Sequence, residues 1–238
     1  MAVDVVWFKK DLRTYDHIPL IEAAKTGNKV LCLYVLEPER LELDDVDLIH
    51  IEWELENAIQ LSKCLEKIGG DLHFATDDMI TTLDKINLDY GISRLLSHEE
   101  TGNSWSYQRD KLVRNWCRNQ CIDWIEYPTN GVIRKLKDRD LWKRKRDARM
   151  RENLYEPPEI TNHAEFHGDV PSMIALGLNP RKLTNYPVPG QSAAFRRLDS
   201  FLNEEAKQFQ WAISSPTLAV KHGSGLSPYL TVGAISMR

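Results

Sequence analysis

Long apolar runs are missing from this 238-residue sequence. No stretch of 18 or more apolar residues occurs, which argues against a membrane-spanning helix. The opening MAVDVVWFKK places a strand-like run ahead of its charges, whereas a secretory signal needs a cationic start followed by an apolar core. We therefore expect a cytoplasmic protein that does not contact a membrane.

Cysteine is scarce and scattered. The four cysteines are Cys32, Cys64, Cys117 and Cys121. No nearby His or Cys pattern completes a zinc set, so we predict no metal site. Idle or buried thiols in a reducing compartment are the simpler interpretation.

The common nucleotide-binding fingerprints are also missing. Neither G-x-G-x-x-G nor G-x-x-x-x-G-K-[ST] occurs, and we find no internal repeat. The sequence therefore carries neither the dinucleotide fingerprint nor the P-loop.

Charge is unevenly distributed along the chain. The net charge is −4, with 42% hydrophobic and 28% charged residues, which is typical of a soluble globular protein. Residues 134–151, RKLKDRDLWKRKRDARMR, hold ten Lys/Arg against three Asp, a local charge of +7, so the other residues carry −11. A solvated interdomain helix is one interpretation, and a contact with DNA phosphates is the other.

Five short apolar runs indicate the fold class. They cover 3–8, 30–36, 71–76, 93–98 and 123–127, and helical patterns cover 17–26, 48–68, 77–88 and 103–120. The runs are continuous, as expected for strands covered on both faces. Such βαβ alternation predicts an α/β domain with a five-stranded, parallel, doubly wound, Rossmann-like sheet.

The sequence changes character after Tyr127. Six prolines fall within 153–190, which predicts a long connector. A helical pattern then begins, with Ala194, Leu198, Phe201, Leu202 and Phe209 on one face. We divide the chain into an α/β domain (1–130), a connector (131–190) and the incomplete start of a helical domain (191–238). The last part is too short for a core of its own, and we expect it to be loosely attached.

The first strand ends abruptly in charge. Phe8 is followed by Lys9, Lys10, Asp11, Leu12 and Arg13, at the sheet edge where ligands of parallel sheets bind. The basic side chains and the following helix start could hold an anion. Alternatively, Asp11 and Arg13 form a local ion pair that fixes the loop.

The same stretch resembles the amino-terminal signature of the DNA photolyase and cryptochrome family. VVWFKKDLRTYDHIPLIEAA matches its pattern of Trp-Phe, two basic residues, Asp-Leu-Arg, a later Asp and a Leu-x-x-Ala helix, and differs at His17, where Asn is usual. Far along the chain, SGLSPYLTVGAIS resembles the family's flavin-phosphate segment. GQSAAFRRLDSFL resembles the helix that opens its flavin domain.

The resemblance implies an FAD-containing flavoprotein whose partner is damaged DNA. Its activity would be deoxyribodipyrimidine photolyase, a lyase that splits cyclobutane dimers with an electron from excited reduced FAD. The cofactor-binding residues it implies are Trp211, Gly223, Ser224, Leu226 and Ser227. Gly223 replaces a usual Thr or Ser, and Trp211 replaces a usual Tyr. No residue of this chain is identified as catalytic, because the family's relay tryptophans and lesion contacts come later.

The resemblance also implies an antenna-chromophore domain. The antenna-side residues are Lys9, Lys10, Asp11, Arg13, Glu100 and Asn103. The folate-gripping Asn-Glu pair is replaced by Trp105-Ser106, which leaves the antenna chromophore unidentified. Glu99, Glu100 and Asn103 could serve another ligand or simply cap a helix.

Several functions remain open at this point. A cryptochrome-type blue-light photoreceptor would have the same FAD without repair. A nucleotide-binding α/β module unrelated to light is disfavoured by the two motifs. We expect the chain to be the amino-terminal portion of a monomeric flavoprotein, inactive alone.

Overall fold

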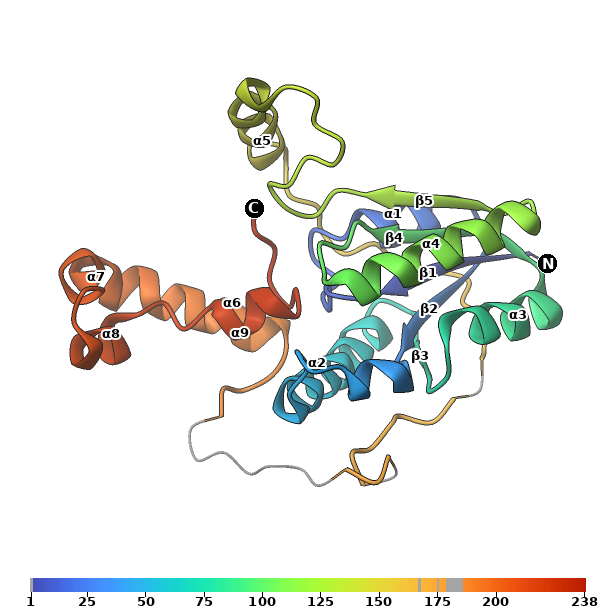
Figure 1. Cartoon of the computed structure of the whole chain (residues 1–238), viewed down its shortest axis with the longest axis horizontal. Coiled ribbons are helices and arrows are strands. Elements are labelled where there is room, and N and C mark those ends of the chain that lie inside the picture. The colour runs from blue at the N-terminus through green and yellow to red at the C-terminus, as the bar shows by residue number, and fades with distance from the viewer. Residues whose placement is uncertain (1, 167, 175, 179–185) are drawn as a thin grey trace.

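A five-stranded parallel sheet forms the centre of the computed structural model, which describes residues 2–166, 168–174, 176–178 and 186–238 (Figure 1). The strands are β1 (Val3–Phe8), β2 (Lys29–Val35), β3 (Leu72–Ala75), β4 (Ile92–His98) and β5 (Asp123–Tyr127). Their order is β3-β2-β1-β4-β5 and every pairing is parallel. The predicted fold class is confirmed.

Helices cover both faces of this sheet. They are α1 (Ile18–Ala24), α2 (Leu48–Glu66), α3 (Met79–Tyr90) and α4 (Ser104–Asn119), with a 3-10 turn, η1 (Pro38–Glu42), before α2. Val6 and Phe8 pack in the core with α1 and α2, whereas Val5 and Trp7 pack with α3 and α4. Because successive side chains of a strand point to opposite faces, both sets must be apolar.

Short polar side chains begin the helices that follow β2, β3 and β4. Asp47 Oδ1 accepts the Ile49 N–H at 2.9 Å, Asp78 Oδ1 accepts the Thr81 N–H at 2.9 Å and Asn103 Oδ1 accepts the Ser106 N–H at 3.0 Å. Each side chain satisfies a backbone donor that the first helical turn leaves unpaired.

The connector is tied to the α/β domain where it is described. The Val30 N–H donates to Asn162 O at 2.9 Å, and the Ala164 N–H donates to Val30 O at 3.0 Å. His73 Nε2 lies 2.7 Å from Ala164 O. The segment therefore crosses the beginning of β2, although residues 167, 175 and 179–185 of the predicted connector lie outside the described residues.

The basic segment forms a short helical projection. A 3-10 turn, η2 (Arg139–Leu141), leads into α5 (Trp142–Met150), and no residue of either is buried. In Figure 1, α5 stands apart from the sheet and its covering helices. The helical part is thus shorter than the basic stretch 134–151.

Residues after 190 form four helices and a π-helical turn. These are α6 (Gln191–Ser200), the π-helical turn η3 (Phe201–Glu205), α7 (Ala206–Ala212), α8 (Pro216–His222) and α9 (Ser227–Thr231). The predicted helix with one buried face is therefore interrupted: Ala194 is fully buried, whereas Leu202 is exposed.

This last part shares the core of the α/β domain. Ala194 of α6 and Ala234 are buried in the same cluster as α1 and α2, and the Trp53 indole N–H of α2 donates to Pro228 O at 2.9 Å. The expectation of a loosely attached tail is therefore wrong for α6 and α9. The outer helices α7 and α8 present more of their surface to solvent, with Trp211 83% and Val220 86% exposed. Among the described residues, every helix is too short or too polar to span a membrane.

Candidate functional site

A cavity lies at the carboxyl ends of β1 and β4. The sheet order reverses at this pair of strands, because β2 and β3 extend on one side of β1 and β4 and β5 on the other. Loops diverge at such a point and leave a crevice, which is where open parallel sheets bind ligands. The cavity measures about 350 Å³, and its lining includes Lys9, Arg13, His98, Glu100 and Asn130.

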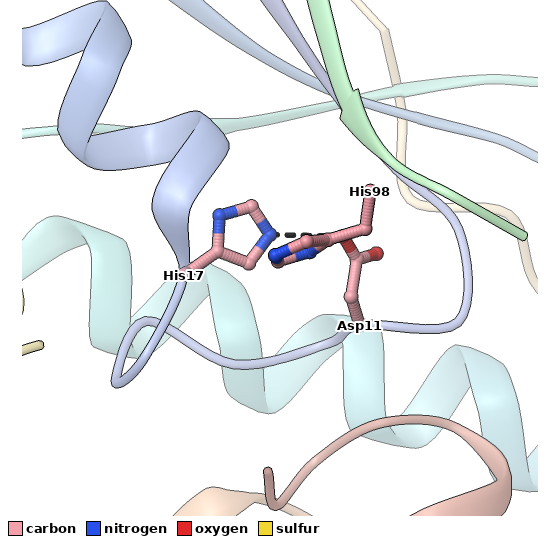
Figure 2. Close-up of side chains that lie close together, drawn as sticks. All are labelled: Asp11, His17 and His98. Carbon is pink, nitrogen blue, oxygen red and sulfur yellow. Dashed lines mark hydrogen bonds and ion pairs between the residues drawn. The ribbon is translucent and has the colours of Figure 1, made fainter. Parts of the chain in front are cut away.

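A buried carboxylate that lines this cavity, that of Asp11, joins two histidines. His17 Nε2 lies 3.0 Å and His98 Nδ1 lies 2.7 Å from Asp11 Oδ2. The backbone N–H of Lys9 donates to Asp11 Oδ1 at 2.7 Å. Figure 2 shows both imidazole rings beside the Asp11 carboxylate. All three side chains are buried, and His98 also faces the cavity.

The hydrogen bonds of His17 define its tautomer. The Leu20 N–H at the start of α1 donates to His17 Nδ1 at 3.2 Å, so the ring proton lies on Nε2 and is donated to Asp11. A carboxylate and two imidazoles within 4.8 Å of one another resemble a metal-ligand set. A metal would, however, need the lone pair of Nε2. The tautomer therefore favours a hydrogen-bonded cluster over a metal centre.

Burial keeps both histidines neutral. Burial and the neighbouring His17 lower the pKa of His98 to about 3, and burial likewise lowers the pKa of His17. Burial alone would raise the pKa of Asp11, but hydrogen bonds from His17 and His98 hold it well below its usual range. His98 donates through Nδ1, so its Nε2 is a hydrogen-bond acceptor, and the residue lines the cavity.

The basic residues of the opening loop are mostly used within the protein. Arg13 donates to the carbonyl oxygens of Tyr15, Asp16 and Gly233 at 3.1 Å each. Its backbone N–H donates to Asp11 O at 2.7 Å, but within the described residues no ion pair or hydrogen bond joins the two side chains, so the predicted local ion pair does not form. Of the three basic side chains of the loop, that of Lys10 is partly exposed, and its ammonium bonds to the Glu54 carboxylate.

Lys9 is a buried cation without a hydrogen bond. Its Nζ lies 4.5 Å from the centre of the Trp7 ring and 3.8 Å from Asp110 Oδ2, and within the described structure it has no hydrogen-bond partner. Burial lowers its pKa. The ring face and the distant carboxylate offset part of the desolvation cost.

The end of the chain closes one side of the cavity. The Leu12 N–H donates to Val232 O at 3.0 Å, and Ser236 and Arg238 both bond to the Asp16 carboxylate. Gly233 has φ +67°, and an added Cβ would lie 2.1 Å from Lys10 O. Only glycine allows so close an approach.

The residues predicted to bind FAD lie on the surface. Ser224 and Leu226 are half-buried and Ser227 is exposed. Beneath the turn, Arg197 donates to Ser224 O at 2.7 Å and to Gly223 O at 2.9 Å, and it pairs with Glu205. The helix expected to assist them, α9, has only five residues.

Trp211 lies on α7, and the described cavities do not bring it together with the serine turn. The hydroxyls and the turn at Gly225, with φ +62°, suit a phosphate. The cavity that Ser227 lines does not include Trp211, the aromatic side chain expected beside the flavin. The donor set therefore fits the phosphate part of FAD only.

The remaining predicted antenna-side residues, Glu100 and Asn103, lie in different places. Glu100 lines the cavity and pairs with Arg109. Asn103 instead caps α4 and donates to Asp45, as one of the interpretations from sequence had it. Glu99 lies 3.8 Å from Arg134.

The family model for DNA photolyase matches residues 4–138. The chain belongs to the DNA photolyase family. A deoxyribodipyrimidine photo-lyase of Agrobacterium fabrum is 26% identical, over 98% of this chain and 51% of its own length. Cryptochrome-1 of Erithacus rubecula is 23% identical, over the whole chain and 42% of its own length. The chain spans about half the length of the curated relatives it matches.

Solved structures share the fold of this family member. A class III photolyase from Agrobacterium tumefaciens has a TM-score of 0.79 at 23% identity, covering 99% of this chain and 51% of its own. An archaeal photolyase from Sulfolobus tokodaii, described with two FAD molecules, has a TM-score of 0.73 at 16% identity, covering 99% and 53%. The likeness thus extends through the helices that follow the sheet.

The histidine cluster of this photolyase-family chain was not predicted from its sequence. His17 was visible as a departure from the family pattern, and His98 as a polar residue ending an apolar run. Neither signal indicated that the two rings share one carboxylate. His98 and Asp11 are 87 residues apart along the chain.

Proposed function

We propose that this chain supplies the antenna-type α/β domain and the first FAD-binding helices of a light-driven DNA repair flavoprotein. The observation that carries the proposal is the similarity to deoxyribodipyrimidine photo-lyases over 98% of the chain, including residues after 190. The substrate would be a cyclobutane pyrimidine dimer in DNA. When bound, reduced FAD supplies the electron that splits the dimer.

The serine turn is the part of this chain that would hold the cofactor. Ser224, Leu226 and Ser227 offer hydroxyl and backbone donors for a phosphate, and Arg197 holds the turn from beneath. Because this donor set accommodates only the phosphate, we expect the chain alone to bind FAD weakly and to repair nothing.

The cavity at β1 and β4 is the antenna site in this proposal. His98 Nε2 would accept a hydrogen bond from a chromophore, and Asp11 would hold the ring of His98 in place. A volume of about 350 Å³ is in the range of small-molecule pockets.

A second function is a cryptochrome-type blue-light photoreceptor. It is favoured by the similarity to vertebrate cryptochromes over the whole chain and by the structural likeness to a Synechocystis cryptochrome, with a TM-score of 0.80 at 17% identity. It would use the same cofactor without repair.

Absorption and repair measurements separate these functions. The visible spectrum of the purified chain, with and without added FAD, reports whether the serine turn suffices for binding. A dimer-containing oligonucleotide is then illuminated with blue light, with this chain and with the complete gene product, and a dark sample serves as the control. We expect light-dependent repair only by the complete product. If that product holds FAD but leaves the dimer intact, the photoreceptor function replaces repair.

A further inference from the structure

The basic segment 134–151, called the basic arm from this point on, is not part of the site described above. Its local charge is +7 in a chain of net charge −4. A charged run is most often a solvated helix face, so the contacts of each cation decide whether the arm has a partner.

Three of the ten cations have partners within the protein. Arg134 bonds to Glu126 at 2.8 Å, Arg146 pairs with Asp147 at 2.8 Å, and Arg149 donates to the carbonyl oxygens of Asn130 and Val132 at 2.7 Å. These contacts and the bond from the Trp142 indole to Gly131 O, at 3.0 Å, anchor the base of the arm.

The other seven cations point into solvent. All are exposed, and within the residues that the structure describes their side chains make no ion pair or hydrogen bond. Four of them, Arg139, Lys143, Arg144 and Lys145, lie on η2 and α5. A short helical segment that buries nothing and keeps four cations exposed and without a partner presents a concentrated positive field.

The position of the arm relates it to the candidate site. Asn130, which accepts the bond from Arg149, also lines the cavity at β1 and β4. The arm therefore rises from the rim of the ligand-facing edge. Charges on such a projection act over about 8 Å at physiological salt, so the local charge of the arm, rather than the net charge of the whole chain, determines its attraction for an anion.

We propose that the basic arm is a binding surface for the phosphate backbone of duplex DNA, contacted without regard to base sequence. The geometry favours a polyanion over a membrane, because Trp142 is the one exposed large apolar side chain of α5 and its indole is bonded to Gly131 O. Membrane-surface helices need a whole apolar face. It favours duplex over single strands, because no series of exposed aromatics along the described arm offers a stacking platform. The proposal deepens the proposed function, on which its choice of DNA rests.

Salt-dependent binding to an undamaged duplex tests the arm. The probe is a fluorescein-labelled DNA of about 20 base pairs without any lesion, and the Kd is measured by anisotropy at several KCl concentrations. The variant carries Lys143→Gln, Arg144→Gln and Lys145→Gln in the 238-residue chain. Each phosphate contact contributes a slope of about 0.9 in log Kd against log salt, so we expect the slope to fall by about 2 to 3 and affinity to fall at least about tenfold.

The control removes the same charge elsewhere. Lys63→Gln, Lys67→Gln and Lys111→Gln change exposed lysines that lie on α2, directly after α2 and on α4, respectively. We expect the control to keep most of the slope, and both variants to keep the wild-type urea midpoint because none of these side chains is buried. Equal slopes for the two variants would overturn the proposal.

Two further outcomes are informative. Binding of the wild-type chain to phosphatidylserine vesicles but not to the duplex would overturn the proposal in favour of a membrane surface. The probe carries no dimer, so its binding does not depend on repair. If the complete product fails to repair DNA but the arm variant still loses salt-dependent binding, the proposed repair function is refuted and the proposal for the arm is supported.

Discussion

Replacing Asp11 by Asn should strongly destabilise the α/β domain. The carboxylate accepts one hydrogen bond from each of two buried histidines and one from the Lys9 backbone N–H. Asparagine has nearly the same shape but only one acceptor oxygen. If that oxygen keeps the Lys9 bond, the amide NH₂ faces the Nε2–H of His17, whose orientation is held by Leu20.

The loss follows from these contacts. A hydrogen bond to a charged group contributes about 1.5 to 3 kcal/mol. Both histidines lose such a bond, and at His17 a donor then faces a donor. We therefore expect the free energy of unfolding to fall by about 3 to 5 kcal/mol, a large part of the stability of a typical domain. His17 can move its ring proton from Nε2 to Nδ1 only by giving up the cap of α1.

Urea unfolding followed by circular dichroism measures this loss. The matched control is Asp123→Asn, the same chemical change at an exposed position at the start of β5, where we expect a change within about 0.5 kcal/mol. The two variants are comparable with the wild type when the slope of free energy against urea is equal in all three proteins. A loss below about 1 kcal/mol in the Asp11 variant would show that the carboxylate does not hold the two histidines as the hydrogen bonds indicate.

Two further predictions concern the same region. Because the pKa of His98 is lowered to about 3 and that of His17 is also lowered, unfolding takes up protons below about pH 6.5. The free energy of unfolding is then highest above that pH. For His98 it falls by about 1.4 kcal/mol per pH unit as the pH drops toward about 4, and His17 adds to the decline. His98→Gln should make this decline shallower in urea titrations at each pH, and an unchanged slope would exclude His98 as the source. Separately, Gly233→Ala and Gly27→Ala both place alanine at positive φ, at a cost of about 1 to 2 kcal/mol. Only the Cβ added at Gly233 meets backbone atoms. The free energy of unfolding should therefore fall by about 1 to 3 kcal/mol more in Gly233→Ala than in Gly27→Ala. Equal losses would contradict the close docking of the chain end on the opening loop.

The fold class was predictable because both faces of the sheet are covered. Val5, Val6, Trp7 and Phe8 are all buried, and such continuous runs between helical patterns are typical of a doubly wound sheet. Packing of the last part was not predictable from its length. Small Ala194 fits against the first domain, and the Gly190 N–H donates to Asn57 Oδ1 at 2.8 Å. A segment too short to form its own core can still be ordered by sharing another.

The candidate site was predictable only in position. Burying charge inside a sheet is costly, so the charges after Phe8 mark the ligand-facing edge of the sheet. Asp11 meets His98 because β4 lies beside β1. The alternation of strands and helices does not specify which strand neighbours β1. The charges of the opening loop are therefore directed largely inward: Asp11 orients two imidazoles, Arg13 joins the loop to Gly233, and Lys9 lies over an indole ring. The anion-binding role considered from sequence is better suited to the basic arm, where seven of the ten cations are exposed and without a partner within the described structure.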